Sequence, residues 1–68
     1  MKNSILTKRE KEVFDLLIGN NTTTDIAKEL NISEKTVRNH ISNVMQKLDV
    51  KSRAVAVVEL LKMKEISL

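Results

Sequence analysis

Three polar side chains suited to directional hydrogen bonding lie close together in the middle of the chain, at Arg38, Asn39 and Ser42. The Arg38 guanidinium can donate two parallel bonds to guanine O6 and N7, and the Asn39 amide can pair in the same way with adenine N6 and N7. The Ser42 hydroxyl can donate to or accept from either kind of base. This stretch is chemically suited to the edges of DNA bases, with these three residues as the predicted base contacts.

A second group of residues near this stretch suits phosphate oxygens, which position a protein on DNA without reporting its sequence. Ammonium groups, hydroxyls and the exposed start of a helix all bind such oxygens. The residues predicted to do so are Thr22, Thr23, Lys35, Thr36 and Lys47. Residues 33–48 carry three basic residues against one acidic residue, which is two of the three net positive charges of the chain.

The composition argues against catalytic and metal chemistry. The 68 residues include no Cys and a single His, so neither a zinc cage nor a thiol nucleophile is expected. No carboxylate pair in an apolar setting and no glycine-rich phosphate loop is present, so we predict no enzymatic activity, no cofactor and no metal. No run approaches the roughly 18 apolar residues of a membrane span, and we expect a cytoplasmic protein that contacts no membrane.

The elements that must position these side chains are helices. One Gly, no Pro and one aromatic residue in a chain with 41% hydrophobic residues favour an all-α fold. A Ser or Thr that can cap a helix precedes each of four stretches with apolar residues at helical spacing. The predicted helices cover about 8–18, 23–30, 34–48 and 53–63. Gly19 with Asn20 is expected to end the first helix in a left-handed turn, and Met45 and Met63 are expected in the core.

The second and third predicted helices, with the short turn between them, match a helix-turn-helix, whose second helix enters the DNA major groove. Ala27 is small where the two helices would approach, Asn31 lies in the turn, and Val37 can pack back on the first helix. The polar side of 34–48 would then face outward.

The last predicted helix carries more apolar residues than one face can bury. Ala56, Val57 and Leu60 lie on one arc that can face the core. The other arc implies a partner, and two identical copies can pair through it about a two-fold axis. The predicted dimer interface is Ala54, Val55, Val58, Leu61 and Lys62. The alternative is a last helix buried in a groove on both sides.

Several segments, in register over most of the chain, resemble the LuxR-type (NarL/FixJ, GerE) DNA-binding domain. They are Leu6–Glu10, Asp25–Ala27, Ile32–Asn43, Lys47–Leu48 and Ser52–Arg53. The resemblance implies a four-helix, dimeric transcription regulator, with 1–68 as one domain, the last helix pairing two copies and RNA polymerase as a further partner. Within the family the chain most resembles stand-alone sporulation regulators. It departs at Lys64, where the family often has Gly, and at Val55, where a polar residue is usual.

Two other interpretations stay open. The chain could be a helical protein-interaction module, or anti-regulator, that keeps the helix-turn-helix shape and binds another protein through its last helix. Sequence-specific DNA affinity distinguishes the two. It could also be the excised output domain of a two-component response regulator, although Met1 and the short leader favour a complete protein.

Overall fold

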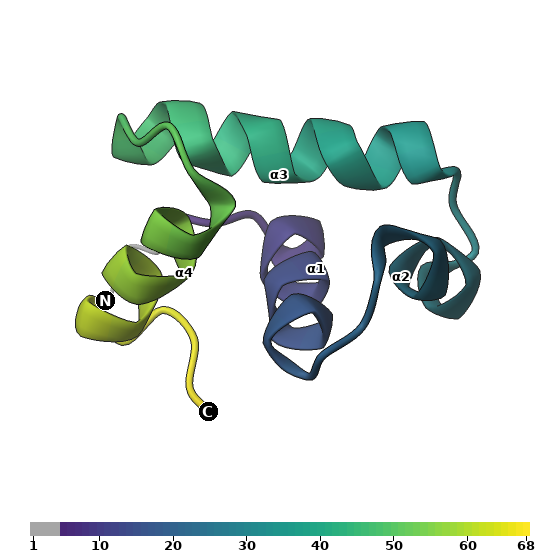
Figure 1. Ribbon diagram of the computed structural model, residues 1–68, viewed down its shortest axis with the longest axis horizontal. Coiled ribbons are helices and arrows are strands. Elements are labelled where there is room, and N and C mark those ends of the chain that lie inside the picture. Colours follow the sequence, from purple (N-terminus) through teal and green to yellow (C-terminus); the bar gives the residue numbers. More distant parts are fainter. Residues whose placement is uncertain (1–4) are drawn as a thin grey trace.

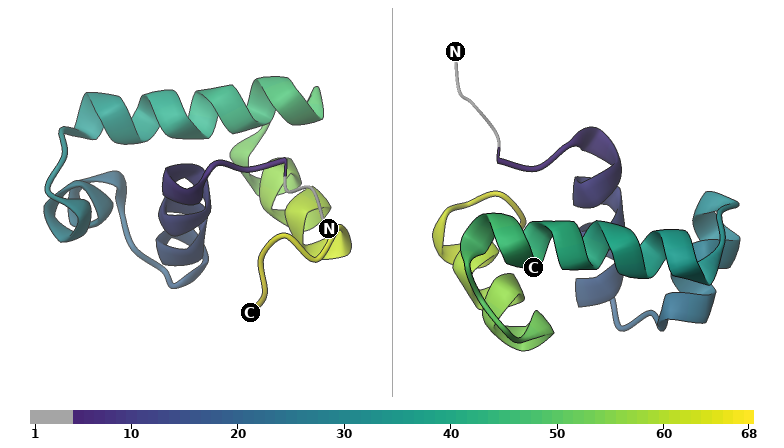
Figure 2. Two further views of the ribbon diagram at one scale, coloured as in Figure 1. Left: turned by 180° about the vertical axis from the view of Figure 1, so that it is seen from behind. Right: turned by 90° about the horizontal axis from the view of Figure 1, so that it is seen from above.

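The structure is a computed structural model that describes residues 5–68, and this part of the chain forms four α-helices and no strand (Figure 1). The helices are α1 (Lys8–Ile18), α2 (Thr23–Leu30), α3 (Glu34–Leu48) and α4 (Arg53–Lys62). The predicted all-α fold is therefore confirmed. The longest helix, α3, runs along one side of the molecule, with α1, α2 and α4 together on its other side (Figures 1 and 2). α2 and α4 lie near opposite ends of α3.

Each helix begins at a capping hydroxyl, as the sequence predicts. The Thr7 side chain accepts a hydrogen bond from the Glu10 N–H at 3.1 Å, and Glu10 Oε1 accepts from the Thr7 N–H at 2.9 Å. Thr22 and Asp25 form the same reciprocal pair at the start of α2. Ser33 and Ser52 cap α3 and α4 through their side-chain oxygens. Such caps stabilise a helix by about 1 kcal/mol each, so these starts are fixed locally.

The helix ends use left-handed residues that are not glycine. Asn31 (φ 57°) ends α2, Asp49 (φ 55°) ends α3, and Lys64 (φ 60°) follows α4. After α1 the left-handed residue is Asn20 (φ 67°), whereas Gly19 has a φ of −81°. The left-handed turn predicted for Gly19 with Asn20 is therefore present, and within it Asn20 rather than Gly19 adopts the left-handed conformation.

Glycine is instead favoured at position 19 because neighbouring atoms leave little room for a side chain. A Cβ at this position would lie 3.3 Å from both the Asn21 side-chain nitrogen and the Leu16 carbonyl oxygen. The Asn21 amide donates to that carbonyl at 2.8 Å, so a methyl group at Gly19 would crowd the bond that closes the turn.

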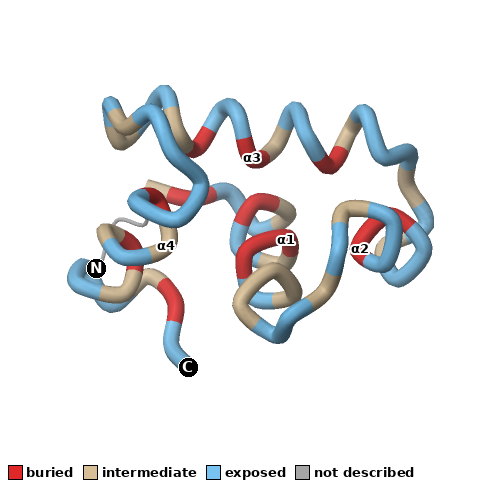
Figure 3. Tube along the Cα trace, viewed as in Figure 1, coloured by how far each residue is buried: buried red, intermediate tan, exposed pale blue. Residues whose placement is uncertain are grey.

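The core lies where the inner faces of the four helices meet (Figure 3). Its fully buried side chains come from every helix, and they are Val13, Phe14, Ile26, Val37, Val44, Ala56 and Leu60. Burying a large apolar side chain contributes about 1.5–3 kcal/mol to the free energy of unfolding. This cluster therefore holds the helices together. The arc of α4 predicted to face the core does so through Ala56, Val57 and Leu60.

The end of α4 differs from the sequence expectation. Met45 packs against the core as predicted, but Met63 is 42% exposed, because α4 stops at Lys62 and the chain turns away at Lys64. That turn brings Ile66 back into the core, where its exposed fraction is 4%. The core position expected for Met63 is therefore wrong, and Ile66 fills part of the core from beyond the helix.

Candidate nucleic-acid interface

The outer face of α3 is a polar surface supported from behind by the core. Val37, Ile41 and Val44 recur at intervals of three and four and are all buried, so they fix which side of α3 points inward. Residues on the opposite side are exposed, and they include Lys35, Asn39, Ser42, Asn43 and Gln46. Figure 3 shows this exposed edge along the side of α3 that no other helix covers. The shape is that of a helix free to enter a groove.

Arg38 lies toward one flank of this face. Its guanidinium is paired with the Glu34 carboxylate one turn earlier at 3.8 Å, and the two side chains are 58% and 49% exposed. A helix-surface pair of this kind is worth about 0.2–0.5 kcal/mol, so it leaves the guanidinium available to a stronger partner. The structure thus places Arg38, Asn39 and Ser42 on one accessible surface, and their base contacts stay a prediction.

The predicted phosphate contacts gather mainly at the start of α2 and of α3. Thr22 is exposed and Thr23 half-buried at the start of α2, and Lys35 is exposed in the first turn of α3. The Thr36 hydroxyl lies 2.9 Å from the Ser33 hydroxyl. These positions agree with the predicted role at phosphate oxygens.

Asp25 lies beside the two predicted threonine contacts. Hydrogen bonds from the Thr22 N–H and hydroxyl hold the pKa of the Asp25 carboxyl below its ordinary value. The carboxylate therefore stays ionised at neutral pH next to Thr22, where a phosphate is expected. Any phosphate at the start of α2 has to approach on the side away from Asp25.

Lys47 is positioned differently from the other predicted contacts. It lies in the last turn of α3, and its ammonium donates to the Ile5 carbonyl oxygen at 3.1 Å and to Glu10 Oε1. The Glu10 side chain is only 4% exposed, and the Lys47 side chain is 35% exposed. Two of the three ammonium protons are used inside the protein, so a phosphate contact by Lys47 would have to use the third. No local sequence pattern indicates this internal role of Lys47.

Glu10 is the buried charge that Lys47 compensates. Burial raises the pKa of its carboxyl, but the hydrogen bonds from Lys47 and Thr7, together with the Lys47 charge, outweigh burial and leave the pKa below the ordinary value of 4.5. Glu10 is therefore ionised at neutral pH. It joins the start of α1 to the end of α3, across 37 residues of sequence.

The outer face of α4 is a second, apolar surface. Val55 and Val58 are 45% and 48% exposed, and Ala54 and Lys62 are also exposed. Leu61 is only partly exposed and packs against the core. The single chain therefore does not bury α4 on both sides. The structure brings these predicted dimer residues together on one face, near the end of α3 that lies away from α2.

Among residues 5–68, no group of three or more His, Cys, Asp or Glu side chains is arranged to hold a metal ion. No helix in that range is long and apolar enough to cross a membrane.

The fold and the exposed α3 face define a class of protein, the helix-turn-helix transcription regulators. The family model described as bacterial regulatory proteins, luxR family, matches residues 4–60. The chain belongs to this family, and it is a DNA-binding transcription regulator. Its relatives are transcriptional regulators and not enzymes, in agreement with the prediction from the sequence.

Individual relatives support this membership. The chain is 69% identical over 64 residues to the spore germination protein GerE of Bacillus subtilis (strain 168), covering 94% of this chain and 86% of GerE. It is 50% identical over 58 residues to the transcriptional regulatory protein DegU of Brevibacillus brevis, covering 85% of this chain but 25% of DegU. A solved structure of the transcription factor GerE superposes with a TM-score of 0.92 at 55% identity, covering 96% of this chain and 97% of that one.

Proposed function

We propose that two copies of this chain bind a pseudo-palindromic DNA site, with each α3 in a major groove and the two grooves roughly 34 Å apart. The observation that carries this proposal is the outer face of α3, where Arg38, Asn39 and Ser42 are all exposed above a buried apolar row. In this proposal residues 1–68 form one LuxR-type domain that needs no cofactor and works in the cytoplasm.

Each residue has a distinct part in the proposed complex. Arg38 bonds a guanine edge, Asn39 bonds an adenine edge, and Ser42 contributes less because its hydroxyl accepts either base type. Thr22, Thr23, Lys35, Thr36 and Lys47 bind phosphate oxygens. Because the lysine and arginine contacts neutralise phosphates and release counterions, binding falls steeply as salt rises.

The dimer is proposed to form through the outer face of α4. Small and β-branched residues there, Ala54, Val55 and Val58, permit two helices to approach closely about a two-fold axis, and Leu61 and Lys62 flank them. Without a partner, the half-exposed Val55 and Val58 would leave an apolar surface in contact with water.

A sedimentation experiment tests this interface. Val58→Asp is expected to convert a dimer at micromolar concentration to a monomer, while circular dichroism stays helical. Leu68→Asp is the matched control, because Leu68 is 97% exposed outside α4 and the same change there is expected to leave the dimer intact. A Val58→Asp protein that remains a dimer would contradict the assignment of this face.

The biological setting follows from the relatives. Because GerE is named as a spore germination protein, we place this chain in the control of sporulation genes, with RNA polymerase as a further partner once the dimer is on DNA.

Selection of bound duplexes from a random pool tests the proposed function as a whole. The expected result is an enriched pseudo-palindrome, bound by two copies of the chain. Affinity that never exceeds the non-specific level in any pool would favour the other candidate, a protein-interaction module that uses the exposed face of α4.

A further inference from the structure

Glu34 is the one acidic residue among the 15 residues of α3, the helix proposed to contact a polyanion. A carboxylate beside phosphates is unfavourable, so its presence at the start of this helix calls for a physical reason. The other first-turn acids of the molecule provide the comparison.

Glu10 and Asp25 are the first-turn acids of α1 and α2, and both are used for capping. Each is the third residue of its helix, and its carboxylate accepts a hydrogen bond from the backbone N–H of the capping threonine. Glu34 is the first residue of α3, where no such bond is formed, because the third residue there is Thr36. Capping therefore does not explain Glu34.

The contact that Glu34 makes is with Arg38. Its Oε1 lies 3.8 Å from Arg38 Nη1, and Glu34 precedes Arg38 by four residues, which is the favourable order for an ion pair on a helix. Both side chains are about half exposed, so the pair adds little to stability. The carboxylate does, however, place a negative charge beside the guanidinium, where it repels an approaching phosphate.

We infer that Glu34 is a specificity-determining residue: its carboxylate, next to the Arg38 guanidinium, repels phosphate and so disfavours phosphate pairing by Arg38 relative to contact with a base edge. A free guanidinium on this surface can pair with phosphate on any duplex, and such a contact carries no sequence information. In the pair with Glu34, the guanidinium keeps donors for the two acceptors of guanine while its charge is partly compensated. This inference rests on the proposed base contact by Arg38.

Glu34→Gln tests the inference through the ratio of two affinities. Fluorescence anisotropy gives the Kd for a duplex that carries the selected site and for a scrambled duplex of equal length, at several salt concentrations. Removing the carboxylate is expected to tighten binding to the scrambled duplex by about tenfold and to steepen its salt dependence by about one phosphate contact. Binding to the selected site is expected to change by less than about twofold, so the specificity ratio falls.

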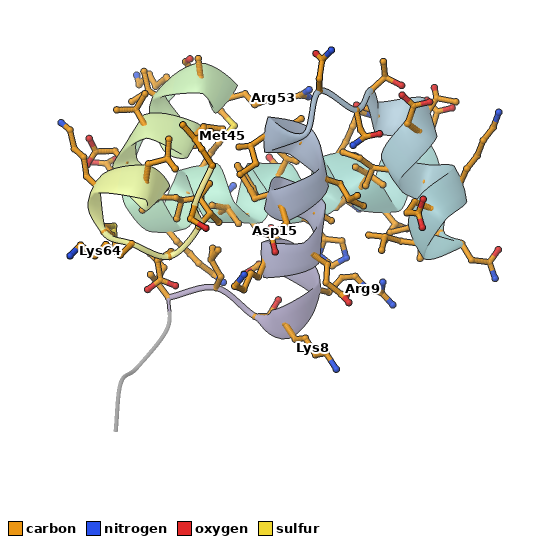
Figure 4. The ribbon with its side chains drawn as sticks, turned by 90° about the horizontal axis from the view of Figure 1, so that it is seen from below. Lys8, Arg9, Asp15, Met45, Arg53 and Lys64 are labelled. Atoms are coloured by element: carbon orange, nitrogen blue, oxygen red, sulfur yellow. The ribbon has the colours of Figure 1, made fainter. Side chains whose placement is uncertain are left out.

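Glu12→Gln is the matched control. Glu12 forms a comparable exposed pair with Arg9 at 3.3 Å, but on α1, and removing its charge changes the net charge of the protein by the same amount. Viewed from the side opposite the outer face of α3, α1 lies in front of α3 and its Lys8 and Arg9 point outward (Figure 4). This control is expected to leave the specificity ratio unchanged.

The same two measurements in the Arg38→Ala background complete a double-mutant cycle. The inference requires that Glu34→Gln no longer lowers the specificity ratio once Arg38 is absent. It is overturned if the ratio falls equally in that background, or if Glu34→Gln shifts both duplexes by one common factor. If Arg38→Ala alone leaves the discrimination against every single-base variant unchanged, the proposed base contact is overturned, and this inference with it.

Discussion

The two ends of α3 carry the same type of ion pair in opposite surroundings. At the N-terminal end, Glu34 and Arg38 are four residues apart and about half exposed. At the C-terminal end, Lys47 pairs with Glu10 across 37 residues, and the Glu10 side chain is almost fully buried. The first pair leaves its cation accessible to an outside partner, whereas in the second two of the three ammonium protons of Lys47 are donated within the protein.

Burial, and not residue type, separates the two roles. An exposed pair contributes about 0–1 kcal/mol, because water and salt screen it. A buried carboxylate that loses its partner costs several kcal/mol, because it is left uncompensated in a poorly solvated place. The N-terminal end of α3 is thus free for recognition, while the C-terminal end fixes α3 against α1 and the segment before it.

The largest expected effect comes from removing the buried pair. Lys47→Met keeps the aliphatic stem but leaves the Glu10 carboxylate unpaired, and we expect a loss of about 2–3 kcal/mol in the free energy of unfolding. The value lies below that of a fully buried pair because Lys47 is itself 35% exposed. Urea unfolding followed by circular dichroism measures the loss, at one protein concentration because dimerisation would contribute to stability.

Arg38→Met is the control at the other end of α3. Its pair with Glu34 is exposed, so the free energy of unfolding is expected to fall by less than about 0.5 kcal/mol. Equal losses for the two variants would remove the distinction between the ends of α3.

The next largest effect is expected at acid pH, where the pair between Glu10 and Lys47 should contribute less to the free energy of unfolding. The pKa of Glu10 is lower in the folded protein than its ordinary value of 4.5, so its ionisation stabilises the fold above that pH. This contribution is lost as the pH falls below about 4.5 and through the folded-state pKa. Urea midpoints measured from pH 7 down to pH 3 are expected to drop less steeply for Glu10→Gln than for the original chain. Parallel curves would show that Glu10 carries no such linkage.

The smallest expected effect is a gain in the free energy of unfolding from a substitution at the end of α3. Asp49 has a φ of 55°, a conformation that glycine adopts without strain, and its negative charge lies at the unfavourable C-terminal end of the helix dipole. We expect Asp49→Gly to raise the free energy of unfolding by about 0.5 kcal/mol and to leave DNA affinity unchanged. A thermal melt together with an anisotropy titration checks both, and a destabilised variant would contradict the expectation.

Local signals account for what the sequence could predict. The helix starts follow from a hydroxyl with an acid three residues later, as at Thr7 and Glu10, and the buried row of α3 follows from helical periodicity. Arg38, Asn39 and Ser42 are predicted as base contacts from their hydrogen-bonding groups and from their position opposite that row. The structure shows all three exposed. These features depend only on near neighbours in the sequence.

Contacts between distant residues could not be predicted in this way. Lys47 on the surface of a helix looks like any phosphate contact until the fold brings Glu10 and the Ile5 carbonyl against it. The burial of Ile66 depends likewise on the turn at Lys64, which no helical period shows. The sequence predicts a left-handed turn at Gly19 with Asn20, but which of the two residues adopts the conformation is seen only in the structure, where it is Asn20.

In the proposed complex the exposed end of α3 contacts bases through Arg38. The most direct test is the affinity of Arg38→Ala for a complete set of single-base variants of the selected site. We expect a loss on the order of 1–3 kcal/mol on the selected site and a relaxed preference at one base pair, with the other positions still discriminated. An equal loss on every variant would contradict it and would make Arg38 a phosphate contact.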